Sequence, residues 1–528
     1  MTTDPLLQRI RAHYDSLNTI GRTADGGFTR LAFSQEESAA HDYFSQQAHL
    51  LGLIEKRDDI GNRYFLTPWS CEKHVLIGSH LDTVRNGGNY DGVVGVLAGF
   101  EAIRLLLENP PAHPTLNFGL VIWRGEESAP FGRPTLGSTC ALLGLRAEDL
   151  KRSDGARTLA DALRKEIGPN AVEVVLGETP CLQQQERQKI SGFLEIHIEQ
   201  STVLETQKVP IGIVTSIRGP IRYSATLHRN SSEPEGKPTL AFARILHTLS
   251  HSLSRILLPH EDLLLTCGVA STEKASPHSP LRSCGGTTIS GYSELHWEGS
   301  PFPEECEYIF SNVCEEFGVQ WQYLSTTPSH SSMAFMGRFD HSGATPMGIN
   351  YRKDANLAAS AAILRIMEKF PEAPLILNAP NDKTSVSFLL EFRGNDKSVR
   401  DKHVETLLLE ANTIAIQSGC QLNIELMADI DPIPSLSPDL QNRIQSACRD
   451  LKISHCSLPS GALHDAATVA MAQIPSALIF IPCREGLSHN PKEHANNEDI
   501  AIGIRVLHQV LGTMAIQEPS FTEREVFA

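Results

Sequence analysis

The sequence lacks the features that mark membrane, secreted or nucleic-acid-binding proteins. No uninterrupted apolar run approaches the roughly 18 residues that a membrane helix needs, although 41% of the residues are hydrophobic. The start MTTDPLLQRIRAHYDSL is typical of an amphipathic helix rather than a signal peptide. Basic residues are also too few to balance the acidic ones, because 46 Lys and Arg stand against 62 Asp and Glu. The net charge of −16 argues against nucleic acid or an anionic membrane as partner and favours a small molecule or a peptide.

Paired cysteines are absent as well. The 11 cysteines are scattered singly, their number is odd, and no CxxC pair occurs. Neither a disulfide framework nor a cysteine zinc site is therefore indicated. We expect reduced cysteines and a cytoplasmic protein.

What the sequence does contain is an alternation of strand-like and helix-like segments. Strands are predicted at 74–82 and 115–123, a helix at 92–108 and a helical stretch near 139 to 164. A strand at 476–483, followed by a helix at 496–515, ends the chain in the same style. This alternation predicts an α/β catalytic domain, with a mixed sheet and helices on both faces, and we assign it residues 1–219 and 428–528.

The middle of the chain has a different rhythm and contains what we interpret as an internal repeat. The helix at 238–249 resembles the one at 356–367, and the segment 293–324 resembles 389–426, each with a turn glycine. We therefore expect an α+β lid region that is duplicated, with a first, degenerate lid unit at 220–330 and a second at 331–427. The alternative is that residues 229–330 are an unrelated insertion.

Histidines and carboxylates recur where the predicted strands end. They are His80, Asp91, Glu126, Glu127, His197 and His489. Taken singly, each has an ordinary explanation, such as a helix N-cap or a solvated loop. Together they lie where open α/β sheets place their sites, and they offer the nitrogen and oxygen ligands of a hydrolytic metal centre.

Two details of spacing refine this interpretation. Asp82, two residues after His80, is placed to fix the tautomer of that imidazole. Neighbouring side chains at a strand end point in different directions, so Glu126 and Glu127 are expected to divide their roles. One would bind the metal and the other would act as a base.

These motifs identify a family by resemblance. The chain resembles the metal-dependent amidohydrolases related to aminoacylase and bacterial carboxypeptidase G, in their hydantoinase/carbamoylase branch. That branch includes N-carbamoyl-L-amino acid hydrolases, allantoate amidohydrolases and β-ureidopropionases. The matching stretches cover nearly the whole chain outside 229–330, and they are GSHLDTVRNGGNYDGVVGVLAG, RGEES, GS at 137–138, EIHIEQSTVLE, DHSGATPMGINYRKDA, SGALHDA and GLSHNPKEH.

The resemblance implies a centre of two divalent ions bridged by Asp91. His80 and His197 would hold one ion, Glu127 and His489 the other, and Glu126 would be the general base. Zinc is the usual ion of the family, and manganese, cobalt or nickel would suit the same ligands. The expected reaction is hydrolysis of a C–N amide bond in a small carboxylate-bearing substrate, an N-carbamoyl or ureido acid.

The resemblance also implies roles outside the metal ligands. His341 would stabilise the oxyanion, and Arg393 would grip the substrate carboxylate with a planar fork. Asn378 and Asn381 would be amide partners, Gln200 would lie beside the amide or ureido group, and His464 would be near the site. Ser201 replaces the usual glycine and the segment APFGRPTLGS departs from the commoner form, so the substrate stays open.

Two other functions remain as alternatives. A dipeptidase or N-acyl amino acid amidase would use the same metal centre. A non-catalytic binding protein would keep the fold without the chemistry, but no expected ligand or base is missing from the sequence.

The repeat leads to an expectation about assembly. Relatives in this branch are generally dimers in which one lid sends its histidine into the neighbouring active site. Here the second lid keeps DHSGATPM and Arg393, while the first has HRNSSEPEGKP and Glu298 at the matching places. We predict a monomer whose two lids pack edge to edge, with His341 acting in its own chain; the alternative is a homodimer.

Overall fold

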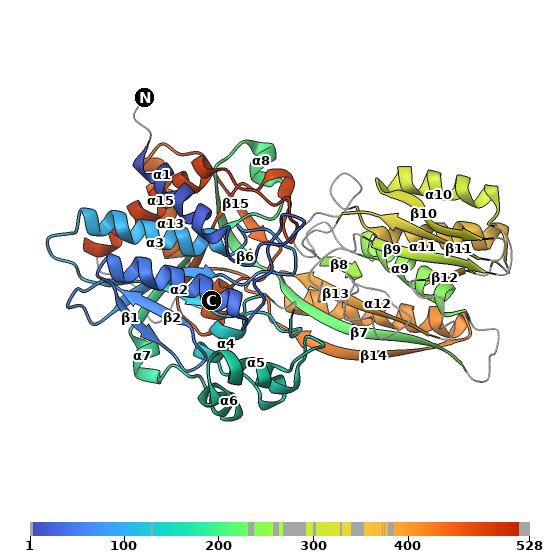
Figure 1. Cartoon of the computed structure of the whole chain (residues 1–528), viewed down its shortest axis with the longest axis horizontal. Coiled ribbons are helices and arrows are strands. Elements are labelled where there is room, and N and C mark those ends of the chain that lie inside the picture. The colour runs from blue at the N-terminus through green and yellow to red at the C-terminus, as the bar shows by residue number, and fades with distance from the viewer. Residues whose placement is uncertain are drawn as a thin grey trace. The chain divides into compact units, whose positions relative to one another are not determined.

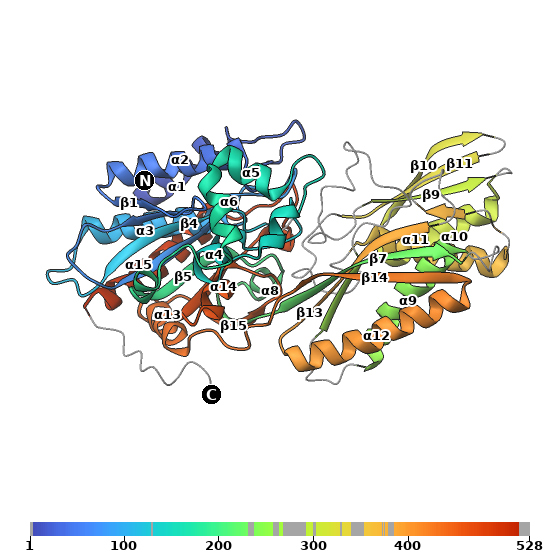
Figure 2. The same cartoon turned by 90° about the horizontal axis from the view of Figure 1, so that it is seen from below.

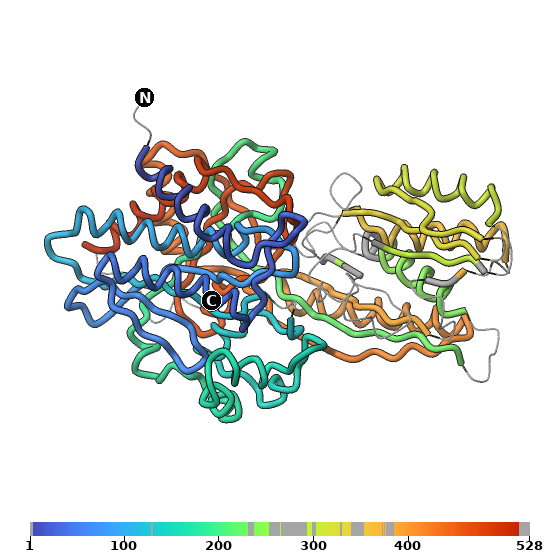
Figure 3. Tube along the Cα trace, in the orientation of Figure 1, coloured from blue at the N-terminus to red at the C-terminus, as the bar shows by residue number. Residues whose placement is uncertain are grey.

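The computed structural model describes residues 4–127, 130–230, 237–256, 263–267, 292–298, 302–327, 330–338, 353–371, 373, 375–377 and 385–516. The chain forms two compact units. The first comprises Met1–Ile217 and Ile433–Ala528, and the second comprises Arg218–Pro432. The tube in Figure 3 shows the chain passing through the second unit as one continuous segment before it completes the first.

The first unit is built on a mixed sheet of eight strands, in the order β1-β2-β4-β3-β5-β16-β6-β15. At its centre β4, β3, β5 and β16 are parallel to one another, whereas β2 and β6 run antiparallel to β4 and β16. The expected mixed α/β fold is thus confirmed. The strand bounds are β1 Ile54–Arg57, β2 Arg63–Leu66, β3 His74–His80, β4 Asn117–Trp123, β5 Ile190–Ile198, β6 Ile211–Ile217, β15 His455–Ser460 and β16 Ser476–Ile481.

Helices lie on both sides of this sheet (Figure 2). Side chains alternate across a strand, so Ile479 and Ile481 of β16 join the core formed with α3 and α15, while Phe480 packs against His464 beside α14. The helices of this unit are α1 Pro5–Leu17, α2 Gln35–Leu50, α3 Val93–Glu108, α4 Leu136–Leu142, α5 Leu159–Glu166, α6 Pro169–Leu176, α7 Gln184–Gln188, α8 Val203–Gln207, α13 Pro438–Asp450, α14 Asp465–Met471 and α15 Asn497–Ile516.

Local sequence explains the central elements. All seven residues of β3 and all seven of β4 are buried, as is typical of parallel strands covered on both faces. The helix α15 is long and apolar enough to cross a membrane by length and composition alone. Most of its apolar side chains are buried in the core of the first unit, where it packs along α3, whereas Ile516 at its end is exposed.

One predicted element is divided. The stretch near 139 to 164 is not a single helix, because α4 ends at Leu142, a short 3₁₀ helix covers Ala147–Lys151, and α5 begins at Leu159. Gly144 and Gly155 both adopt φ of 89°, a left-handed conformation that interrupts a helix.

The second unit holds two four-stranded antiparallel sheets, in the orders β14-β7-β13-β8 and β10-β11-β9-β12. Their helices share one apolar core, in which α9 contacts both α11 and α12. The bounds are β7 Gly219–Arg229, α9 Pro238–Ile256, β8 Leu263–Cys267, β9 Tyr292–Glu298, α10 Glu304–Phe317, β10 Gln320–Thr327, β11 His330–Met336, α11 Ala355–Lys369, β12 Leu375–Leu377, β13 Ser385–Gly394, α12 Lys397–Gln417 and β14 Cys420–Asp429.

The strand pairing does not follow the expected division at residue 330. In Figure 1 the green β7 lies between the orange β13 and β14, strands far away in the sequence. In the other sheet β11 likewise lies between β9 and β10. Each sheet therefore takes two strands from 220–330 and two from 331–427. The expected boundary at residue 330 therefore does not separate the two sheets.

Candidate metal centre

The parallel strands at the centre of the first unit bring the predicted ligands together. His80 is the last residue of β3, His197 lies near the end of β5, and Glu126 follows β4. His489 follows β16 through a short loop. Because β4, β3, β5 and β16 run in one direction, their carboxyl ends meet at one edge of the sheet.

Two groups of side chains at this edge could each hold a metal ion. His80, Asp91 and His197 form one group, and Asp91, Glu127 and His489 form the other. The Nε2 atoms of His80 and His197 lie 3.6 and 3.0 Å from Asp91 Oδ1. On the other side, His489 Nε2 lies 3.5 Å from Asp91 Oδ2 and 3.2 Å from Glu127 Oε1. Asp91 is thus shared through its two different oxygens.

Hydrogen bonds aim two of the imidazoles at the shared carboxylate. His197 Nδ1 lies 2.9 Å from the Ile198 carbonyl oxygen, and His80 Nδ1 lies 3.1 Å from the carbonyl oxygen of Asp82. A carbonyl can only accept, so Nδ1 carries the proton in both rings and Nε2 offers a lone pair. Gly92 is required beside His80, since it has φ of 66° and a Cβ there would lie 2.4 Å from His80 Nε2.

Asp82 links β3 to the paired glutamates. Its Oδ1 lies 3.3 Å from His80 Nδ1, and its two oxygens accept hydrogen bonds from the backbone N–H groups of Glu126 and Glu127 at 3.1 and 2.9 Å. The Asp82 carboxylate therefore orients the imidazole and the turn after β4 together. Glu127 belongs to a ligand group, whereas Glu126 belongs to neither; its Oε2 lies 3.9 Å from His80 Nε2.

The electrostatics of the pocket suit a cation. Between 1 and 7% of the surface is exposed for each of the six side chains of the site, which are His80, Asp91, Glu126, Glu127, His197 and His489. Burial lowers the pKa of His489, but Glu127 and Asp91 outweigh it and raise the pKa to about 9. Burial raises the pKa of Glu126 well above its usual range despite the opposing effect of His80, and Glu127 adds to the rise. A buried cluster of carboxylates with imidazoles, of the ligand types that zinc and similar ions accept, fits a pair of divalent cations.

Gln200 and His464 lie against the ligands. Gln200 Nε2 donates to Asp91 Oδ2 at 2.7 Å, and its Oε1 is buried with no hydrogen-bond partner among the described residues. The His464 ring packs edge-on to that of His197 with centroids 4.5 Å apart, and its Nε2 lies 2.9 Å from Ser460 Oγ. Gln200 and His489 both adopt φ of 58°, a left-handed conformation that is uncommon for non-glycine residues.

Arg393 lies at the end of β13 in the second unit. It is only 3% exposed, so it is not an ordinary surface arginine. Its Nε donates to Glu391 Oε1 at 2.8 Å, and Arg222 on the neighbouring strand bonds Glu391 Oε2 at 2.9 Å. Burial opposes ionisation of Glu391, but Arg393 and Arg222 outweigh it and lower the pKa to about 2. The other predicted residues of this unit, His341, Asn378 and Asn381, lie outside the described residues.

Sequence reasoning missed several buried polar groups around the centre. Ser488 Oγ donates a hydrogen bond to Asp91 Oδ2, and Glu493 Oε1 accepts one from the backbone N–H of Asp91. Asp465 accepts from Ser138 at 2.5 Å, and burial, with Glu195 in support, raises its pKa to about 8. Ser488 and Glu493 stand inside the motif GLSHNPKEH, so the spacing around His489 was the signal that could have identified them.

Comparison with known proteins identifies the family of the chain. The sequence profile of the peptidase family M20/M25/M40 matches residues 76–513. An N-carbamoyl-L-amino-acid amidohydrolase from Pseudomonas sp. (strain NS671) is 26% identical over 508 residues, which cover 95% of this chain and 97% of the relative. An allantoate amidohydrolase from Escherichia coli (strain K12) is 26% identical over 513 residues, covering 97% and 98%.

A solved structure supports the fold. An amidase of the hydantoinase/carbamoylase family from Burkholderia vietnamiensis superposes with a TM-score of 0.65 at 22% identity. The match covers 97% of this chain and 98% of that one. The likeness in fold therefore extends over both units.

Proposed function

Because the chain belongs to the peptidase family M20/M25/M40, we propose that it is a metal-dependent amidohydrolase that cleaves a C–N bond other than a peptide bond. The proposed substrates are small N-carbamoyl or ureido acids. The observation that carries the proposal is the pair of ligand groups sharing Asp91, with Glu126 beside them and in neither group. Relatives named N-carbamoyl-L-amino-acid amidohydrolase and allantoate amidohydrolase support the substrate class.

The residues at the sheet edge would hold two divalent ions, and we take zinc as the first choice, with manganese, cobalt or nickel compatible with the same donors. Such ions supply Lewis acidity, which lowers the pKa of a water molecule from about 16 toward 7. Glu126 would accept the proton of the attacking water and pass it to the leaving nitrogen. The position of Glu126 beside the two ligand groups, and in neither of them, supports this role.

Substrate binding would use residues other than the metal ligands. Arg393 would grip the substrate carboxylate, and its ion pair with Glu391 would hold the guanidinium in a fixed orientation. Gln200, with Nε2 bonded to Asp91, would present its Oε1 to an N–H of the ureido group. His341 would stabilise the oxyanion, and Asn378 and Asn381 would assist as amide partners.

We propose further that the lid region is a duplication whose two copies exchange strands. Residues 219–327 and 330–429 each contain a strand, a helix, two strands, a helix and a strand in that order. In both sheets the first strand of one copy lies between the fourth and third strands of the other, and the second strand lies at the edge. This shared pattern supports a duplication over an unrelated insertion.

The exchange supports a monomer. The first two strands of each copy complete their sheet with the last two strands of the other, so the pair of lids is assembled within one chain. A homodimer remains the alternative assembly. The free state of the cysteines among the described residues supports a cytoplasmic location.

Ammonia release from N-carbamoyl-L-amino acids, allantoate and 3-ureidopropionate tests the proposed function. The panel is run with each candidate metal beside dipeptides and N-acetyl amino acids, whose cleavage releases no ammonia and is followed instead by the free amino acid produced. We expect turnover of at least one carbamoyl or ureido acid and little turnover of the peptides. Cleavage of only dipeptides or N-acetyl amino acids would instead show a dipeptidase or an N-acyl amino acid amidase, and no turnover of any substrate would favour a binding protein.

A further inference from the structure

The shared carboxylate of Asp91 is held by side chains from two other segments of the chain. Gln200 Nε2 and Ser488 Oγ both lie 2.7 Å from Asp91 Oδ2. They also contact each other at 3.0 Å. Gln200 is 2% exposed and Ser488 is fully buried, so water does not compete for these hydrogen bonds.

Glu493 holds the backbone of the same residue. Its Oε1 accepts hydrogen bonds from the N–H groups of Tyr90 at 2.9 Å and Asp91 at 3.0 Å, and its Oε2 lies 3.2 Å from Ser488 Oγ. Gly88 permits this approach, because a Cβ at that position would lie 2.1 Å from Glu493 Oε1. Ser488 therefore lies between Glu493, which fixes the backbone of Asp91, and the carboxylate of Asp91.

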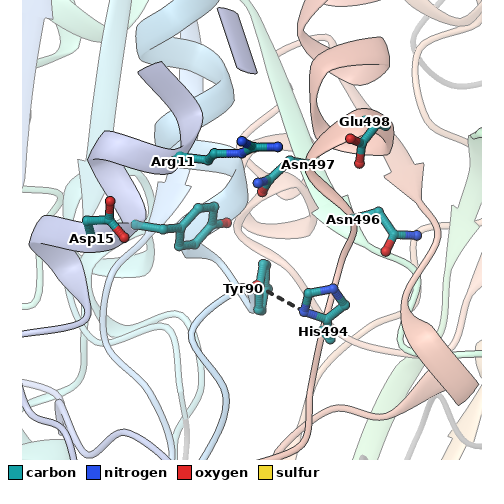
Figure 4. A pocket seen from close by; sticks show the side chains of 8 residues that line it. Arg11, Asp15, Tyr90, His494, Asn496, Asn497 and Glu498 are labelled. Atoms are coloured by element: carbon teal, nitrogen blue, oxygen red, sulfur yellow. Dashed lines mark hydrogen bonds between the residues drawn. The ribbon is translucent and has the colours of Figure 1, made fainter. Parts of the chain in front are cut away.

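A further contact joins the two loops on the outer side. Tyr90 OH and His494 Nδ1 lie 3.1 Å apart (Figure 4), at the wall of a pocket of about 250 Å³. Tyr90, which precedes Asp91, thus contacts His494, which follows Glu493. The loop before α3 and the loop after β16 form one hydrogen-bonded assembly.

The two oxygens of Asp91 are not equivalent in this assembly. Both side-chain donors reach Oδ2, the oxygen that faces His489 at 3.5 Å. Oδ1 instead faces the imidazoles of His80 and His197. Loss of the Gln200 or Ser488 donor therefore affects first Oδ2, the oxygen in the group with Glu127 and His489.

We infer that Gln200, Ser488 and Glu493 are positioning residues that set the affinity of one ion, the one held by Asp91, Glu127 and His489. Without them Oδ2 would lose its fixed direction, while Oδ1 would keep its place between two imidazoles. Partners of metal-ligating carboxylates typically change metal affinity by about 10- to 100-fold. The inference rests on the proposed metal centre.

Metal titration of the metal-free chain tests the inference. Zinc is titrated by calorimetry into the wild type, Ser488→Ala and Glu493→Gln, and the unfolding temperature of each metal-free protein is measured. We expect two ions in the wild type. In both variants one ion should bind about 10- to 100-fold more weakly, the other should be unchanged, and the metal-free unfolding temperature should be close to that of the wild type.

Matched controls separate positioning from general damage. Ser45→Ala removes a buried hydroxyl that contacts Glu55 and Arg63, and Glu101→Gln alters a buried carboxylate paired with Arg9 and His13. Both controls should keep the affinities of the two ions. If Ser488→Ala does not fold, Gln200→Met removes the other donor to the same oxygen and takes its place.

Two results would overturn the inference. In one, the wild type binds two ions and the variants bind both with unchanged affinity. In the other, both ions weaken equally and the metal-free unfolding temperature falls, which would show a structural role only. A wild type that binds no ions would instead overturn the metal centre, so the two failures are distinguishable.

Discussion

At the scale of single residues, the adjacent glutamates carry the clearest division of chemistry. Glu127 Oε1 faces His489, while Glu126 lies in neither ligand group and has a pKa raised by burial. Changing Glu126→Gln should lower turnover by about three orders of magnitude or more with metal content nearly unchanged. Kinetics and elemental analysis of one preparation measure both quantities. Glu186→Gln, at a partly exposed carboxylate of α7, should change neither; loss of metal in step with activity would reverse the roles of Glu126 and Glu127.

Arg393 supports a second prediction at this scale. Its Nε is bonded to Glu391, and lysine cannot reproduce the planar guanidinium that we propose binds the substrate carboxylate. Arg393→Lys should weaken apparent substrate binding by about 1 to 3 kcal/mol, with metal content unchanged. KM on carboxylated substrates is the measurement, and Arg365→Lys, an exposed arginine paired with Glu316, is the control. Unaltered KM on every such substrate would remove Arg393 from the site.

The sequence indicated the two candidate ligand groups better than the residues that bond to them. His80, Asp91, Glu127 and His489 follow strand ends within recognisable motifs, so their residue types and spacing were enough to indicate a metal site. The bond of Gln200 to Asp91 joins residues 109 positions apart, and that of Glu493 joins residues 402 apart. Such contacts depend on how the loops close in three dimensions, which local spacing does not encode.

At the scale of helices and strands, periodicity located the elements but not their pairing. The strands β3, β4 and β16 and the helices α3 and α15 lie where the apolar patterns predicted them. The exchange of strands between the lid segments was missed, because the pairing of β9 with β11 and of β7 with β13 joins strands from different segments, and the periodicity of one strand does not say which strand it pairs with. The helical stretch predicted near 139 to 164 is likewise interrupted, because Gly144 has positive φ, which apolar content does not predict.

The pairing of β7 with β13 leads to a prediction about pH. Arg222 and Arg393 lower the pKa of buried Glu391 to about 2, from an ordinary value of 4.5. A lowered folded-state pKa stabilises the fold above the unfolded value, and this stabilisation, on the order of 3 kcal/mol, is lost as the pH falls toward 2. The free energy of unfolding of Glu391→Gln should therefore lie well below that of the wild type at pH 7.

The difference in the free energy of unfolding between the wild type and Glu391→Gln should narrow between about pH 5 and pH 2, as measured by denaturant unfolding across that range. Glu425→Gln, at an exposed position of β14 in the same sheet, serves as the control and should follow the wild type at every pH. A gap that stays constant with pH would show that Glu391 contributes through packing rather than through its charge.

At the scale of the whole molecule, the exchanged lid strands predict a self-contained chain. Light scattering should give the monomer mass of 57.9 kDa. Mixing His341→Ala with Glu126→Gln protein should restore no activity, because each monomer would use its own lid. A dimer mass, or activity that recovers on mixing, would show that lids serve neighbouring chains instead.

The central claim is that two ions at the Asp91 site enable hydrolysis of a carbamoyl or ureido acid. The most direct measurement is ammonia release by the metal-free chain as zinc or manganese is added back in known equivalents. We predict no release without metal and a rise that levels off at about two ions per chain, absent in Glu126→Gln despite normal metal uptake. Full activity in a preparation shown to be metal-free would contradict the account.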